Sequence, residues 1–115
     1  MSDLQVRCDV PGASGALPVV RLSGPLVHGE HLDKLRDTVR SLIADGRHHI
    51  VLDVANVDAL DSTGIAALLS IKRAIGGTGR VTLLCPTQRL RNALAMIRAT
   101  VLFEMVDDEA QLPTE

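Results

Sequence analysis

The residues best suited to chemistry in this sequence are the four consecutive ones Asp61-Ser62-Thr63-Gly64. They bring a carboxylate, two hydroxyls and a glycine together in one segment. The side chain of Asp61 or Ser62 can accept hydrogen bonds from the free backbone N–H groups at the start of a helix. A serine hydroxyl there also suits phosphorylation, because a phosphate at a helix N-terminus is stabilised by the helix dipole and the free N–H groups. We therefore interpret this segment as a candidate binding or modification site.

The apolar pattern around the segment predicts a strand before it and a helix after it. Residues 49–54 are an apolar, β-branched run, which is typical of a central strand covered on both faces. Residues 62–75 have the period of an amphipathic helix, whose predicted core side carries Ile65, Leu68, Ile71 and Ile75. The site is thus predicted at the carboxyl end of a strand, where open α/β sheets place their functional sites.

Periodicity and turn residues predict the other elements. They are strands over 4–10, 17–22, 81–85 and 102–106, helices over 30–45 and 87–99, a final helical turn over 107–112, and a loop over 11–15. Gly24-Pro25 is expected to end the second strand, and Leu90, Leu94 and Ile97 to face inward from the 87–99 helix. The resulting order, β-β-α-β-α-β-α-β-α, predicts an α/β fold with a mixed four- to five-stranded sheet packed with about four helices. No linker or repeat interrupts the chain, so we expect one domain over 1–115.

Composition excludes several classes of function. Lys plus Arg number 12 and Asp plus Glu 14, and this net charge of −2 argues against direct binding of nucleic acid. Cys8 and Cys85 lack metal-type spacing, and we expect buried free thiols in a reducing compartment. No apolar run approaches the roughly 18 residues that span a bilayer, and residues 1–3 begin no signal peptide. We expect a cytoplasmic protein without membrane insertion.

The outer face of the 62–75 helix is a candidate docking surface. Small residues there allow another backbone to approach closely, and Arg73 offers a contact at its edge. The predicted partner-binding residues are Asp61, Ser62, Thr63, Gly64, Ala66, Ala67, Ser70 and Arg73. On the helix over 87–99, Arg89 and Arg91 are candidates to contact an acidic partner.

Catalytic and metal-binding patterns are not found in the sequence. No paired carboxylates in a Gly-rich site and no nucleophile elbow accompany Ser62. No metal site is expected at His28, Glu30 and His31, because the sequence offers no further strong ligand near the two histidines. We interpret this segment as the solvated start of a helix. Gly76-Gly77-Thr78-Gly79 follows a helix and precedes a strand, which is the reverse of the phosphate-loop order. We expect a binding protein without enzyme activity and without a cofactor.

Six features together resemble the STAS domain family, and within it the stand-alone anti-sigma factor antagonists. They are Leu22-Ser23-Gly24-Pro25-Leu26, Ile50-Val51-Leu52-Asp53-Val54, Leu60-Asp61-Ser62-Thr63-Gly64-Ile65, Gly76-Gly77, Cys85-Pro86 with the arginines and leucines that follow, and the acidic predicted closing helix with Asp107 and Ala110. The resemblance implies a STAS-type domain in which an anti-sigma serine kinase phosphorylates Ser62. It further implies that the unmodified protein captures this anti-sigma factor and frees the sigma factor, and that a PP2C-type phosphatase restores the active form.

One position departs from the family pattern. Many members carry an acidic residue three positions after the glycine that ends the second strand, and this chain has Val27 there. The departure favours an alternative, in which the protein is a STAS regulatory or scaffold subunit that is never phosphorylated. Its partner would then be a transporter ATPase or a signalling assembly.

Overall fold

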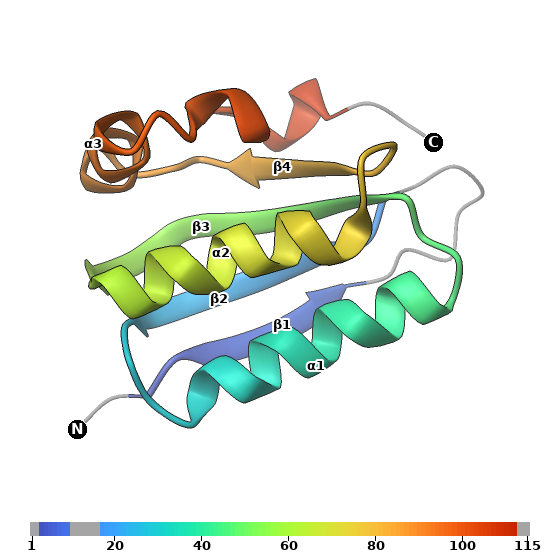
Figure 1. The fold of residues 1–115 in the computed structure, drawn as a ribbon, viewed down its shortest axis with the longest axis horizontal. Helices are drawn as coiled ribbons and strands as arrows, with labels where there is room; N and C mark the ends of the chain where they lie inside the picture. Colours follow the sequence, from blue (N-terminus) through green and yellow to red (C-terminus); the bar gives the residue numbers. More distant parts are fainter. Residues whose placement is uncertain (1–2, 10–16, 113–115) are drawn as a thin grey trace.

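The computed structural model describes residues 3–9 and 17–112 of the chain, so the predicted loop over 11–15 lies outside the described residues. The elements are β1 (Gln5–Asp9), β2 (Val19–Leu26), α1 (His31–Ala44), β3 (His49–Leu60), α2 (Ser62–Ile75), β4 (Arg80–Leu84), α3 (Gln88–Met96), the 3₁₀ turn η1 (Thr100–Leu102), β5 (Glu104–Val106) and the 3₁₀ turn η2 (Glu109–Gln111) (Figure 1). The predicted order is confirmed. The last predicted helix is a single 3₁₀ turn, which leaves three α-helices in the described part of the chain in place of about four. None of these helices is long and apolar enough to span a bilayer.

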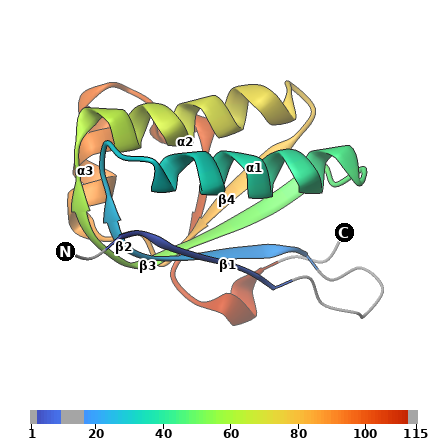
Figure 2. The same cartoon turned by 90° about the horizontal axis from the view of Figure 1, so that it is seen from below.

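The five strands form one mixed sheet in the order β1-β2-β3-β4-β5. The first pair is antiparallel and the other three pairs are parallel, as the sequence predicts. Helices α1 and α2 lie side by side over one face of the sheet, and the chain after β5 returns to the opposite face (Figure 2). With this arrangement the β3–α2 junction lies at the carboxyl end of the parallel strands.

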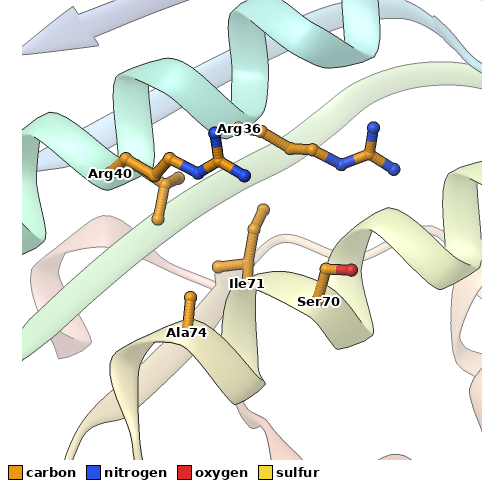
Figure 3. Close-up of a pocket in the computed structure, with 6 residues that line it drawn as sticks. Arg36, Arg40, Ser70, Ile71 and Ala74 are labelled. Atoms are coloured by element: carbon orange, nitrogen blue, oxygen red, sulfur yellow. The ribbon is translucent and has the colours of Figure 1, made fainter.

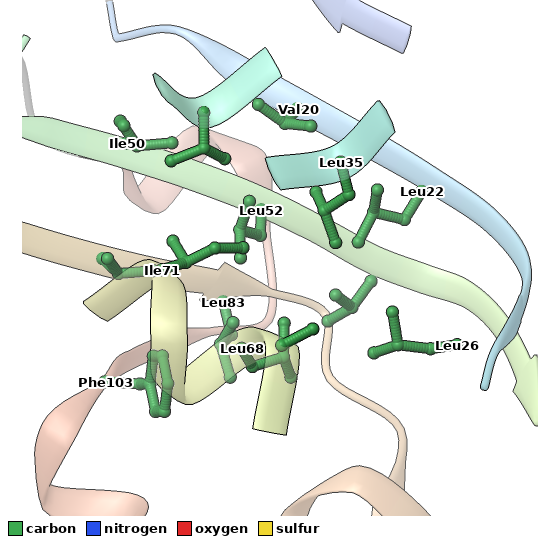
Figure 4. Packing of buried hydrophobic residues seen from close by; sticks show 14 of the residues in the cluster. Val20, Leu22, Leu26, Leu35, Ile50, Leu52, Leu68, Ile71, Leu83 and Phe103 are labelled. Atoms are coloured by element: carbon green, nitrogen blue, oxygen red, sulfur yellow. The ribbon is translucent and has the colours of Figure 1, made fainter. Parts of the chain in front are cut away.

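The main hydrophobic core fills the space between the sheet and the helices. Leu35 of α1, Leu68 of α2 and Leu52 of β3 are all fully buried there (Figure 4). A smaller apolar cluster covers the other face of the sheet, with Val51 and Leu84 at its centre. Neighbouring residues of β3 therefore face opposite clusters, which confirms the prediction of a central strand covered on both faces.

Two strands are longer than predicted, and the two extensions pair with each other. Strand β2 continues through Gly24-Pro25 to Leu26, and β3 continues past its predicted end at Val54 to Leu60. Pairing with β1 stops at Ser23, so the proline lies in a stretch that pairs with β3 alone. Proline is tolerated there because its missing N–H is not needed on the open side. The expectation that Gly24-Pro25 ends the strand is therefore wrong.

Helix α3 is shorter than predicted and ends at Met96, three residues before Ala99. Arg98 adopts a left-handed conformation with φ of 57°. Its N–H donates to the carbonyl of Ala95 at 3.0 Å, and the N–H of Ala99 donates to that of Leu94 at 2.8 Å. This pair of bonds is a Schellman motif, which closes the helix. Ile97 is consequently turned outward and is 51% exposed, so the prediction that it faces the core is wrong.

The two cysteines are free thiols, but they are not both buried as predicted. Cys8 is exposed, and Cys85 is half-buried with its Sγ donating to the carbonyl oxygen of Asp107 at 3.2 Å. Cys8 lies near the end of β1, an edge strand with a neighbour on one side only. The alternation of apolar residues in β1 therefore does not guarantee burial at that end.

Candidate functional site

Asp61 caps the N-terminus of α2. Its backbone is extended, with φ of −137° and ψ of 179°, and its Oδ1 accepts a hydrogen bond from the N–H of Gly64 at 2.9 Å. The other oxygen, Oδ2, accepts from the backbone N–H of His28 at 2.9 Å. One carboxylate thus satisfies a free N–H group of the helix and also holds the β2–α1 connection against it. The sequence leaves the cap open between Asp61 and Ser62, and the structure assigns it to Asp61.

The backbone N–H donors of His28 and then Gly64 hold the pKa of Asp61 below its usual value. These donors stabilise the ionised carboxylate more than the protonated form. Asp61 is therefore negatively charged at neutral pH, directly beside Ser62.

Gly64 allows the first turn of α2 to pack against the end of β2. A Cβ at this position would overlap the backbone carbonyl oxygen of Leu26. The same carbonyl accepts a long hydrogen bond of 3.4 Å from the N–H of Asp61. A glycine is needed here because the two segments approach so closely that no side chain fits between them. The backbone of Gly64 is helical, so its conformation does not require a glycine.

Ser62 is the first residue of α2 and is exposed. Within the part of the chain that the structure describes, its hydroxyl makes no hydrogen bond. Asp61 and Gly64 fix the backbone on either side, while the hydroxyl remains accessible. The arrangement presents one nucleophilic oxygen on a rigid turn, close to N–H groups at the helix start that can accommodate a negatively charged group.

The other predicted partner-binding residues divide over three parts of α2. Thr63 and Ser70 lie on the side of α1, Arg73 lies on the side of η1, and Ala66 is exposed between them. Ala67 is fully buried in the main core, so its expected place on the outer face is wrong. It follows Ala66 on the helix, and a step of one residue rotates the side chain by about 100°. An alanine pair on a helix gives no hydrophobic signal that would separate the two faces.

Two hollows lie between α1 and α2. One, of about 390 Å³, joins Thr63 to the start of α1, with Glu30, Asp33 and Arg36 in its lining. The other, of about 120 Å³, is lined by Arg36, Arg40, Ser70 and Ala74, and the two arginines extend from α1 toward α2 (Figure 3). The first hollow carries charges of both signs, whereas the only charged residues that line the second are the two arginines.

A second pair of hollows lies on the opposite side of α2, and we call it the α2–α3 groove. Helix α3 lies beside the N-terminal end of α2, and η1 follows it (Figure 1). The first hollow, of about 390 Å³, is lined by Leu60, Asp61, Ser62, Ile65, Arg89, Ala93, Met96 and Ile97. The second, of about 550 Å³, is lined by Leu69, Lys72, Arg73, Gly76, Gly77 and Leu102. Ser62 therefore faces α3 and its immediate neighbour Thr63 faces α1.

The apolar lining of this groove is what the sequence prediction misses. Met96 is 86% exposed and Leu102 is 43% exposed, although both are large and apolar. Met96 lies off the predicted core stripe of its helix. A large apolar residue in such a position is the one sign in the sequence of an apolar surface there.

The two candidate arginines have different surroundings. Arg89 lines the groove, whereas Arg91 donates to Asp107 at 2.6 Å and contributes to holding β5.

A family model described as STAS domain matches residues 7–112 of the sequence. The match covers most of the chain, and the mixed sheet with its Asp61-capped helix agrees with it, so this chain belongs to the STAS domain family. The resemblance drawn from the sequence is thereby confirmed at the level of the family. No functionally curated protein matches the chain.

Solved structures of anti-sigma factor antagonists have the same fold. The chain is similar to SpoIIAA in its unphosphorylated form, with 22% identity and a TM-score of 0.70 over 93% of this chain and 92% of that chain. It is similar to the Bacillus cell fate determinant SpoIIAA in the phosphorylated form, with 21% identity and a TM-score of 0.69 over 92% of this chain and 95% of that one. An anti-sigma factor antagonist from Mycobacterium paratuberculosis shares 16% identity, with a TM-score of 0.76 over 94% and 89% of the two chains. At identities this low, the structural similarity shows a common fold and nothing more.

Proposed function

We propose that this protein is an anti-sigma factor antagonist that binds an anti-sigma serine kinase while Ser62 is unmodified. Phosphorylation of Ser62 ends the binding, a PP2C-type phosphatase restores it, and the cycle regulates sigma-factor-dependent transcription in the cytoplasm. The observation that carries the proposal is the geometry at the start of α2. Ser62 is exposed there, while Asp61 and Gly64 anchor the turn to His28 and Leu26.

The chemistry of this turn favours a switch by charge. A phosphoserine adds about −1.5 to −2 charge at neutral pH. The N–H groups at the start of α2 stabilise that charge, so the fold tolerates it. The ionised Asp61 lies directly beside it, and together the two form a strongly negative surface where the partner must approach. Binding is lost by repulsion at the interface, without unfolding of the domain.

The proposed interface includes Asp61, Ser62, Thr63 and Gly64 with the exposed Ala66, Ser70 and Arg73. Asp61 and Gly64 act through the position of the turn, because both are engaged with the β2–α1 connection. Ser62 and Ala66 are open to direct contact. The protein acts in this proposal by binding and does not itself catalyse a reaction.

The test is incubation of the full chain with ATP and each purified anti-sigma serine kinase of its source organism, followed by mass spectrometry. One kinase should add a single phosphate, located at Ser62. Ser62→Ala should abolish modification and keep kinase binding, and Ser62→Asp should bind poorly. Ser41→Ala is the matched control, because it removes an exposed hydroxyl of α1 outside the proposed interface and should leave modification intact. Modification at another residue, or none with any kinase, contradicts the proposal.

Val27 favours a second candidate function. It lies between Leu26 and His28, which both contact Asp61, so the acidic residue of many family members would stand close to the modification site. Without that charge, the protein would serve as a constitutive regulatory or scaffold subunit of a transporter ATPase or signalling assembly. Co-purification with such an assembly from native cells, with Ser62 unmodified throughout, would favour this candidate over the first.

A further inference from the structure

The α2–α3 groove is an apolar surface that remains uncovered in the described chain. Within the described residues the exposed large hydrophobic side chains all lie between positions 96 and 102; Met96, Ile97 and Leu102 line the groove, and Val101 lines neither hollow. Exposed apolar patches of this kind are characteristic of interaction sites. On the opposite wall, Ile65 and Leu69 are one helical turn apart and only partly buried. The two hollows thus each have apolar residues on both sides, and they follow one another along α2.

The charges around this groove are predominantly positive. Arg89 lines the first hollow, and Lys72 and Arg73 line the second. Within the described residues, neither Arg73 nor Arg89 forms an ion pair. The only carboxylate in the lining belongs to Asp61, and both of its oxygens already accept backbone hydrogen bonds. The chain as a whole has a net charge of −2, so this local excess of cations is opposite in sign to the molecule.

We propose that the α2–α3 groove docks a helical segment of the anti-sigma partner that carries an apolar stripe flanked by acidic residues. The inference rests on the proposed function and names the part of the partner that the surface accepts. From Ser62 to Arg73 the α2 backbone extends about 16 Å, which matches a partner helix of about 11 residues. Leucine-type side chains fill the two hollows, and carboxylates meet Arg89 and Arg73 at the rim.

Two other occupants fit the surface less well. A second copy docked by two-fold symmetry would place the same cationic rim against itself. A membrane surface would contact protruding side chains, whereas this surface is hollowed between two helices. The acidic helix satisfies both the apolar walls and the charge of the rim.

This docking mode also gives the phosphorylation of Ser62 a direct consequence. The hydroxyl lies in the lining of the first hollow together with Arg89. A phosphate there adds about two negative charges to a lining in which the Asp61 carboxylate already balances the one cation, Arg89, so the hollow becomes negative. The acidic partner segment is then repelled from the end of the groove that it must enter.

The first experiment uses a defined probe with the full-length protein. A 12-residue helical peptide with leucines at positions i, i+4 and i+7 and glutamates elsewhere is compared with the same peptide carrying lysines in place of glutamates. In NMR titrations the glutamate peptide should shift the amide signals of Ile65, Leu69 and Leu102, and the lysine peptide should not. Equal binding of both peptides, or shifts confined to the α1 side of α2, overturns the proposal.

Matched variants test the same surface. Met96→Asp and Arg89→Glu should each weaken binding of the glutamate peptide, and of the anti-sigma kinase, at least about fivefold. Val101→Asp is the control for the first, because Val101 is 87% exposed and apolar but lines neither hollow. Arg40→Glu is the control for the second, because Arg40 is exposed on α1. Circular dichroism should show that all four variants fold.

The outcomes separate this inference from the proposed function. If the peptide binds the groove and no anti-sigma kinase binds the protein, the proposed function fails and the docking chemistry stands. If a kinase binds equally to wild type and Met96→Asp, the inference is overturned and the proposed function stands. Self-association of the wild type that Met96→Asp abolishes, or groove-dependent binding to phosphatidylglycerol vesicles, assigns the surface to another occupant and also overturns it.

Discussion

Gly64 packs against the carbonyl group of Leu26 so closely that the oxygen occupies the place of a Cβ at position 64. This contact joins the end of β2 to the first turn of α2. Together with the two hydrogen bonds accepted by Asp61, it fixes the position of Ser62 relative to the β2–α1 connection. The functional proposal depends on this junction, because a switch by one phosphate requires a hydroxyl in a defined place.

Substitution Gly64→Ala should destabilise the protein. The added methyl group must push the Leu26 carbonyl and the α2 terminus apart, and such overpacking costs about 2–3 kcal/mol. Urea denaturation measures the free energy of unfolding. Gly77→Ala is the matched control, because a Cβ there meets nothing within 4 Å, and it should change stability by less than about 0.5 kcal/mol. Similar losses in the two variants would refute the role assigned to the contact.

The Asp61 carboxylate should make stability depend on pH. Backbone hydrogen bonds, first from His28 and then from Gly64, lower the pKa of Asp61 in the folded state. Its stabilising contribution is therefore complete above the unfolded pKa of about 3.9 and is lost as pH falls through the lower folded pKa. The difference in unfolding free energy between wild type and Asp61→Asn should shrink from pH 5 downward in a series of urea titrations. A difference that stays constant with pH would contradict the ionised cap.

The left-handed backbone of Arg98 should be a source of strain. A non-glycine residue with φ of 57° is disfavoured, and glycine adopts this conformation freely. Arg98→Gly should therefore raise the free energy of unfolding by about 0.5–1 kcal/mol, partly offset by the larger entropy of the unfolded chain. Arg40→Gly, in the regular interior of α1, should instead lower it by about 1 kcal/mol. Thermal unfolding of both variants tests the contrast.

Periodicity predicts the buried elements well, because burial on a regular helix or strand imposes a regular pattern. The covered strand β3, the core stripe of α1 and the start of α2 at Ser62 all follow from it. The candidate site at the strand–helix junction follows in turn. Its position depends only on where the pattern changes from strand to helix.

Periodicity fails where a distant partner decides the local structure. The extension of β3 to Leu60 is stabilised by pairing with β2 across Gly24-Pro25, and local sequence alone predicts a break there. The end of α3 depends on a left-handed Arg98, which no residue preference signals. The α2–α3 groove follows from that early end, since it turns Ile97 outward and leads the chain into η1. The most apolar part of the candidate interface is therefore the part that the sequence reveals least.

In the proposed function, a single phosphate on Ser62 controls partner binding. This dependence is tested most directly by calorimetric titration of the purified anti-sigma kinase into two homogeneous forms of the protein, one unmodified and one phosphorylated at Ser62. The phosphorylated form should bind at least about tenfold more weakly, because the new charge repels the partner at the rigid turn beside Asp61. Equal affinities for the two forms would contradict it.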